Sequence, residues 1–183
     1  MKILKWTILW LVTWGISQWL WGGDPLEATP VPGTILSIFL ASLVLAFVLF
    51  PSERKIWLSR MSPLGIPIIL FSIIIFSILD ERLLLSNMLT STHVLFQQFM
   101  IAVLAFMVPS EKFSRTATRV LVLFGASHLL LIIFMSWPWT VFFTLIVSAV
   151  AVFWTYLIQR VKHGITISYL IHLGFYLVFF SIL

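Results

Sequence analysis

The stretch Ile68-Ile-Leu-Phe-Ser-Ile-Ile-Ile-Phe-Ser-Ile-Leu79 decides the fold, because it is apolar almost throughout and carries no charge. Its two serines are its only polar residues. With its flanks, from Ile66 toward Leu85, it reaches the ~20 residues that a helix needs to cross a bilayer. We therefore predict a transmembrane helix here.

The whole chain has the same character. Of its 183 residues, 61% are hydrophobic and 9% are charged, and the mean hydropathy is +1.13. Soluble domains carry about 25% charged residues, and a chain of this length still exposes about 30% of its unfolded surface. This composition excludes soluble enzymes, disordered tails and secreted disulfide scaffolds. The chain has no cysteine, which also excludes thiolate nucleophiles and cysteine-ligated metal centres.

Six further apolar stretches follow the same pattern. They cover about residues 3–21, 34–50, 93–108, 120–137, 139–158 and 165–183. We therefore predict an all-α, polytopic membrane helix bundle with about seven transmembrane helices. Residues 1–183 form a single integral membrane domain in this prediction. The first stretch has no small-residue cleavage site after it, so we expect an uncleaved helix.

Basic residues mark alternate connections between the predicted helices. Ten of the eleven lie on one side: Lys2, Lys5, Arg54, Lys55, Arg60, Lys112, Arg115, Arg119, Arg160 and Lys162. By the positive-inside rule, this places the N-terminus in the cytoplasm and the C-terminus outside. These charges thus indicate topology, and we expect the lipid bilayer, not nucleic acid, as the partner. The short connections favour a bacterial inner membrane, and residues 51–63 are predicted to lie on its inner surface.

Ionisable residues inside spans cost about 2.5–3.5 kcal/mol to insert, which makes each one a functional candidate. Asp80 and Glu81 lie in the distal part of the third span, His128 in the fifth and His172 in the seventh. At ~1.5 Å per residue, Asp80 and the two histidines lie at overlapping depths. We therefore expect these residues to converge.

The seventh span also carries a polar stripe. Ser168, His172 and Tyr176 are four residues apart and share one helix face, which must point toward protein. His93 opens the fourth span and is followed by Gln97 and Gln98. The simplest interpretation of the buried histidines is hydrogen bonding between helices.

These residues carry a family resemblance. Three segments follow one another in the chain: Ser77-Ile-Leu-Asp80-Glu81-Arg-Leu-Leu-Leu85, Phe124-Gly-Ala-Ser-His128 and His172-Leu-Gly-Phe-Tyr176. The two histidines are 44 positions apart. The order and spacing of the segments resemble the motifs E-E-x-x-x-R, F-x-x-x-H and H-x-x-x-N of the CPBP family (CaaX protease and bacteriocin-processing, also called Abi). The family consists of multi-span intramembrane proteases. The resemblance covers about residues 67–180.

The resemblance implies an endopeptidase that acts on a membrane-embedded or lipidated peptide. Asp80 would activate water beside Glu81, and His128 would assist this base or bind the nucleophilic water. His172 and Tyr176 would stabilise the oxyanion. The chain departs from the motifs at Asp80, at Leu85 in place of arginine, and at Tyr176 in place of asparagine.

Several alternatives remain open at this point. A catalytically degenerate scaffold or subunit would bind a partner transmembrane helix without cutting it. A rhomboid-like serine protease would use Ser127 with His172. No cofactor is predicted, although a metal at Asp80, Glu81, His128 and His172, or haem between the two histidines, is conceivable.

Overall fold

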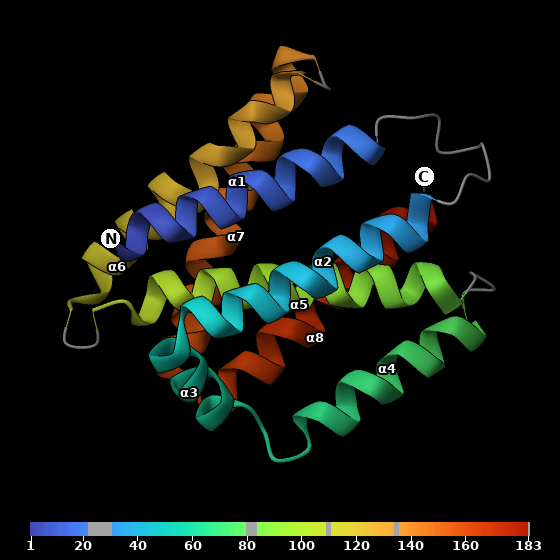
Figure 1. Cartoon of the computed structure of the whole chain (residues 1–183), viewed down its shortest axis with the longest axis horizontal. Helices are drawn as coiled ribbons and strands as arrows, with labels where there is room; N and C mark the ends of the chain where they lie inside the picture. Colours follow the sequence, from blue (N-terminus) through green and yellow to red (C-terminus); the bar gives the residue numbers. More distant parts are fainter. Residues whose placement is uncertain (22–30, 80–83, 109–110, 134–135, 183) are drawn as a thin grey trace.

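The protein is described by a computed structural model that covers residues 1–21, 31–79, 84–108, 111–133 and 136–182. All regular structure in these residues is helical, so the all-α prediction is confirmed. The α-helices are α1 (Lys2–Trp21), α2 (Val31–Leu49), α3 (Pro51–Arg60), α4 (Gly65–Leu79), α5 (Leu84–Phe106), α6 (Phe113–Val120), α7 (Trp137–Arg160) and α8 (Gly164–Ile182) (Figure 1). Helix α6 continues through a π-helical turn, η1 (Leu121–Gly125), into a 3-10 helix, η2 (Ala126–Ile133).

Three helical segments in the described residues are long and apolar enough to cross a membrane. They are α5, the continuous segment from Phe113 to Ile133, and α7. A fourth results if α2 and α3, which meet at an angle of 106°, are counted as one bent span. The structure thus has the composition of a membrane protein in these segments.

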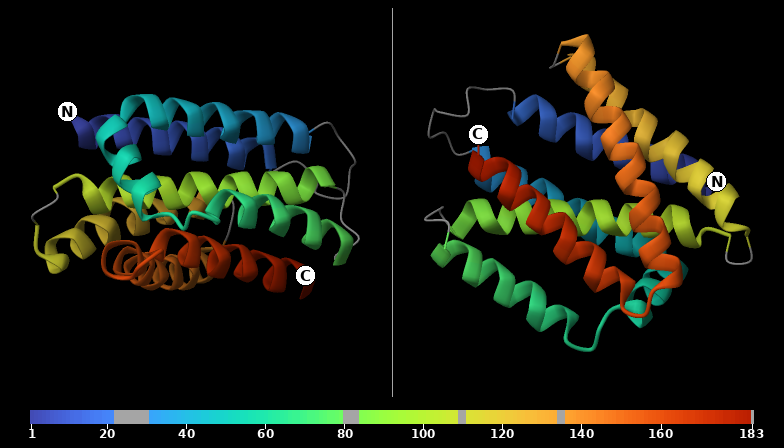
Figure 2. Two further views of the ribbon diagram at one scale, coloured as in Figure 1. Left: turned by 90° about the horizontal axis from the view of Figure 1, so that it is seen from below. Right: turned by 180° about the vertical axis from the view of Figure 1, so that it is seen from behind.

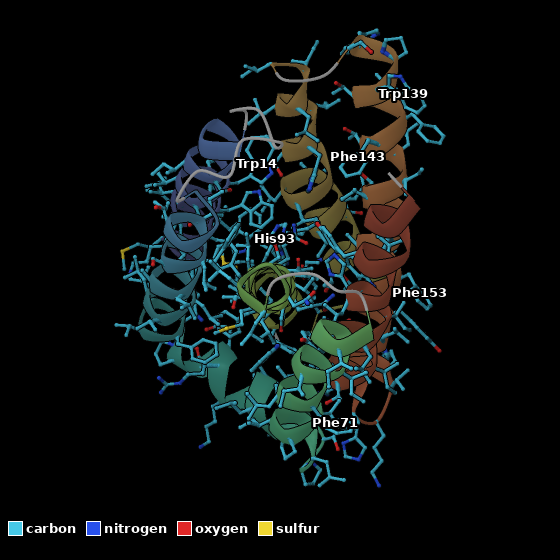
Figure 3. All side chains as sticks on the ribbon, turned by 90° about the vertical axis from the view of Figure 1, so that its right-hand side faces the viewer. Trp14, Phe71, His93, Trp139, Phe143 and Phe153 are labelled. Atoms are coloured by element: carbon cyan, nitrogen blue, oxygen red, sulfur yellow. The ribbon has the colours of Figure 1, made fainter. Side chains whose placement is uncertain are left out.

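Helix α5 is the centre of the molecule. Figure 3 looks along it, and the other helices surround it. From Ser91 to Phe106, every side chain except that of Leu95 is buried. It is also the least hydropathic of the three candidate spans. Because protein surrounds this helix, polar side chains on it meet other side chains instead of lipid.

Large apolar side chains cover the outside of the bundle. Phe71, Trp139 and Phe153 point away from the interior, whereas His93 lies inside it (Figure 3). The exposed fractions of these three aromatic side chains are 62%, 63% and 48%. Such an exterior is unfavourable in water and suits a lipid environment.

Predicted and observed helix boundaries differ most at the start of α5. Helix α5 begins at Leu84, whereas the apolar stretch begins only at His93. The intervening turns hold Ser86, Asn87 and Ser91, and the last two are buried. Because these turns are polar, the predicted apolar stretch does not include them. Hydropathy identifies helix surfaces that face lipid, whereas the polar side chains of these turns face protein.

Helix α3 lies across one end of the bundle (Figure 2). Lys2 Nζ donates to Glu53 Oε1 at 2.5 Å, which ties α3 to the start of α1. At the other end of α3, Arg60 donates to the carbonyl oxygens of Ile158 and Gln159 at the end of α7. Trp57, between Glu53 and Arg60 in the sequence, is buried and packs edge-on against Phe99. These contacts fix the direction in which α3 leaves α2.

Candidate functional site

Three buried histidines from three different segments face the core. His93 belongs to α5, His128 to η2 and His172 to α8, and their exposed fractions are 7%, 4% and 3%. The ring of Tyr176 joins two of them, with its centroid 5.5 Å from that of His93 and 5.2 Å from that of His172. We call His93, Gln97, Gln98, His128, Trp154, Ser168, His172 and Tyr176 the polar core.

Gln98 links α5 to α8 at the centre of the polar core. Its amide oxygen accepts a hydrogen bond of 2.9 Å from Ser168 Oγ, and its amide nitrogen faces His172. That nitrogen donates to His172 Nδ1 at 3.1 Å. An imidazole that accepts at Nδ1 carries its proton on Nε2. His172 therefore presents an N–H donor on its far side.

Gln97 and His93 form a second pair of the same kind along α5. The amide nitrogen of Gln97 lies 2.8 Å from His93 Nε2 and donates to it, since residues four apart stack on a helix. Both side chains are buried. Gln97 also hydrogen-bonds to Tyr176, which connects this pair to α8.

His128 lies where helix α6 becomes irregular. Its Nδ1 donates to the carbonyl oxygen of Phe124 at 2.8 Å, so Nε2 is the acceptor in the neutral ring. Aromatic side chains surround it, with Trp10, Phe124 and Phe143 having ring centroids 5.0–6.2 Å away. Interruptions of helical geometry of this kind often occur at functional sites.

The π-helical turn η1, which ends at Gly125, packs closely against α7. A Cβ atom built on Gly125 would lie 2.3 Å from Ser148 Oγ, a distance that real atoms do not adopt. The glycine at position 125 thus permits α7 to approach this turn closely.

An unsatisfied donor lies beside His172. The ring of Trp154, on α7, is 3.8 Å from that of His172. Trp154 Nε1 is buried and has no hydrogen-bond acceptor among the described residues. Buried donors without partners are rare, and Trp57 Nε1 and Thr144 Oγ1 are the two other such buried polar atoms among the described residues.

The predicted site residues fall into two groups. His128, His172 and Tyr176 lie in or beside the same core, whereas Asp80 and Glu81 lie outside the described residues. His93, Gln97 and Gln98 are not among the site residues that the sequence predicts. Three polar residues at positions 93, 97 and 98 of an otherwise apolar stretch were the available signal.

Two alternatives can be compared with the described geometry. Within that part of the chain, no group of three His, Asp or Glu side chains is arranged to share a metal ion. Ser127 Oγ accepts from Trp10 Nε1 at 2.9 Å and donates to the carbonyl oxygen of Phe124 at 2.6 Å. Neither of these hydrogen bonds forms the serine–histidine pair that a rhomboid-like site requires.

No family model, curated protein or solved structure matches the chain. The CPBP resemblance therefore depends on the order and spacing of its three motifs. The chemistry of the polar core is the independent guide to function.

Proposed function

We propose that this protein is a seven-span membrane protein of the bacterial inner membrane that binds a membrane-embedded peptide segment without hydrolysing it. The N-terminus is cytoplasmic in this proposal, and the fold is CPBP-like with a degenerate site. The observation that carries the proposal is the amide partner of His172. Gln98, a neutral amide, is the residue that hydrogen-bonds to this imidazole at Nδ1.

An amide in that position favours binding over catalysis. A general base must take up a proton from water near neutral pH, and a glutamine amide has no such titration. Gln98 also carries no charge with which to stabilise an imidazolium. Its two hydrogen bonds instead fix His172 in one tautomer and one orientation.

The resulting set of donors suits a peptide carbonyl group. His172 presents Nε2–H, and Trp154 Nε1–H, on the ring stacked against it, has no acceptor within the described structure. The bilayer core holds no water to hydrogen-bond a backbone carbonyl group, so a carbonyl that leaves its helical hydrogen bond needs another donor. A locally unwound transmembrane segment would thus supply the acceptor that these donors lack.

A second candidate function is the endopeptidase implied by the resemblance. It is favoured by one observation, that His128, His172 and Tyr176 share one buried core although they come from distant parts of the sequence. In this function Asp80 or Glu81 supplies the base.

A defined transmembrane peptide tests both functions. The protein is reconstituted in nanodiscs with a single-span synthetic peptide that carries a fluorophore. Binding is followed by energy transfer and cleavage by mass spectrometry. We expect saturable binding with no new peptide termini, and about tenfold weaker binding in His172→Ala and Trp154→Phe, since one lost hydrogen bond costs about 1–1.5 kcal/mol.

Leu129→Ala is the matched control, because this exposed residue of η2 adjoins His128 in sequence and points outward. Cleavage that disappears in Asp80→Asn or Glu81→Gln would establish the peptidase instead. The absence of both binding and cleavage in a folded protein would overturn both functions.

A further inference from the structure

The basic residues at the end of the bundle divide into two classes by their contacts. Three of them are used within the structure: Lys2 pairs with Glu53, Arg119 pairs with Glu111, and Arg60 donates to carbonyl oxygens at the end of α7. Glu53 and Glu111 are the acidic residues of the described chain, and both are neutralised by these pairs. Lys2, Arg60 and Arg119 therefore already have partners within the structure.

Seven further cations have no ionic partner among the described residues. They are Lys5, Arg54, Lys55, Lys112, Arg115, Arg160 and Lys162. Ten basic and two acidic side chains leave this end with a net charge of +8. Basic side chains without acidic partners repel one another and favour the binding of anions.

The segments that carry these cations lie near one end of the molecule. Figures 1 and 2 show the N-terminus, α3, the start of α6 and the turn between α7 and α8 there. The C-terminal ends of α1 and α8 lie at the opposite end (Figure 2). We call this region the basic end.

Helix α3 gives the basic end both charged and apolar exposed groups. Its buried face holds Glu53 and Trp57, which fasten it to the bundle. Its outer face holds Lys55 and Leu58, and the exposed fraction of Leu58 is 47%. An apolar side chain beside exposed cations, on a helix that crosses the bundle end, is typical of the membrane interface.

The contacts of Arg60 place α3 beside the turn that carries two more cations. Arg60 reaches the carbonyl oxygens of residues 158 and 159, and Arg160 and Lys162 follow directly. Both of these residues are exposed. Arg60 of α3 and Arg160 of α7 therefore lie near each other at this end.

We propose that the basic end binds anionic phospholipid headgroups, with Arg54, Lys55 and Lys162 as contacts to their phosphates. Charge complementarity selects an anionic partner, and the exposed Leu58 beside Lys55 selects a lipid instead of a soluble anion. Each basic residue near an anionic surface contributes about 1 kcal/mol, and this attraction weakens with salt. The proposal is independent of the peptide-binding function of the polar core.

The test compares thermal unfolding in nanodiscs of phosphatidylcholine with unfolding in nanodiscs that also contain phosphatidylglycerol. We expect phosphatidylglycerol to raise the unfolding temperature of the native protein by several degrees, and 0.5 M NaCl to reduce that gain. The triple variant Arg54→Gln/Lys55→Gln/Lys162→Gln is expected to lose more than half of the gain. Arg82→Gln, which removes the one basic residue that is not among the ten on this side of the predicted topology, is expected to retain it.

An equal gain in the triple variant would overturn the proposal. So would a gain that soluble glycerol phosphate reproduces in phosphatidylcholine nanodiscs, since it would identify a site for a free anion. If the triple variant does not fold, native mass spectrometry of Lys162→Gln decides the question. Retention of as many bound phosphatidylglycerol molecules as in the native protein would then refute the proposal.

Discussion

At the residue scale, His172 is held from three sides by groups that leave it little freedom. Gln98 fixes Nδ1, Trp154 covers one face at 3.8 Å, and Tyr176 lies 5.2 Å away. A ring oriented in this way always presents the same N–H in the same direction. Such preorganisation reduces the entropy that binding would otherwise cost.

Gln98→Ala is expected to lower the free energy of unfolding by about 1–2 kcal/mol. The substitution leaves His172 Nδ1 and Ser168 Oγ without their partner in a buried site. Chemical denaturation in mixed micelles measures the change. Thr118→Ala, which removes only an exposed hydrogen bond within α6, serves as the control and is expected to change little. An equal loss in both variants would show that the Gln98 bridge has no special role.

The pair Lys2–Glu53 gives the protein a stability that depends on pH. Burial by itself raises the pKa of Glu53, but the hydrogen bonds from Lys2 and Ser52 outweigh it, so the pKa lies below its ordinary value of 4.5. The folded state therefore binds this proton less readily than the unfolded state. The corresponding stability is present above pH 4.5 and is lost as the pH falls toward the pKa of the folded state.

Glu53→Gln is accordingly expected to unfold at a lower temperature than the native protein at pH 7. The two proteins are expected to converge as the pH falls well below 4.5. Thermal scans across this range measure the difference. A difference that stays constant down to acid pH would contradict the ionic role of Glu53.

Which residues were visible from the sequence depended on their chemistry. His128, His172 and Tyr176 stood out because ionisable or polar groups are rare in apolar spans. Gln98 was not singled out, although it makes the central contact, because an amide is neutral and its spacing alone does not reveal its partner. Contacts between distant helices, such as that between Gln98 and His172, follow from packing that no local pattern encodes.

At the element scale, the segment from Phe113 to Ile133 changes its helical geometry where it meets α7. The π-helical turn ends at Gly125, the residue whose missing side chain admits Ser148. The 3-10 helix that follows carries His128. The close packing of Gly125 against Ser148 and the position of His128 thus result from the same local change in helix geometry.

Gly125→Ala is expected to destabilise the protein by about 1–3 kcal/mol, because its Cβ would overlap Ser148 Oγ. Gly174→Ala is the matched control, since a Cβ there meets no atom within 4 Å, and it is expected to be neutral or stabilising. Thermal unfolding compares the two. Adding Ser148→Gly to Gly125→Ala is expected to recover part of the loss, and no recovery would place the strain elsewhere.

How accurately the ends of a helix were predicted depended on whether the helix faces the outside of the bundle or other helices. The predicted stretch 139–158 became α7 and differs from it by two residues at each end. The predicted stretch 120–137 was less accurate, because the corresponding helical segment runs from Phe113 to Ile133. The predicted start of α5 was wrong by nine residues, because the helix begins at Leu84 and its first turns carry polar groups. The presence of helices was therefore predictable from hydropathy, whereas the length of a protein-facing helix was not.

At the scale of the whole molecule, the seven predicted spans and their orientation stay predictions with a direct test. The chain has no cysteine, so each introduced cysteine is the only one present. Labelling of intact cells with a membrane-impermeant maleimide is expected to modify Asp24→Cys and Ser136→Cys. Lys55→Cys, Lys112→Cys and Lys162→Cys are expected to react only after the membrane is permeabilised. Labelling of the last three in intact cells would reverse the orientation, and mixed results would change the number of spans.

The burial of α5 has a consequence for how the protein is made. This helix leaves the ribosome before α7 and α8, which later enclose its polar side chains. During synthesis, His93, Gln97 and Gln98 would thus confront lipid without their eventual neighbours. Entry of α5 into the bilayer is therefore expected to wait at the translocon until the last two helices emerge, which makes the insertion of this protein a cooperative event among helices instead of a succession of independent ones.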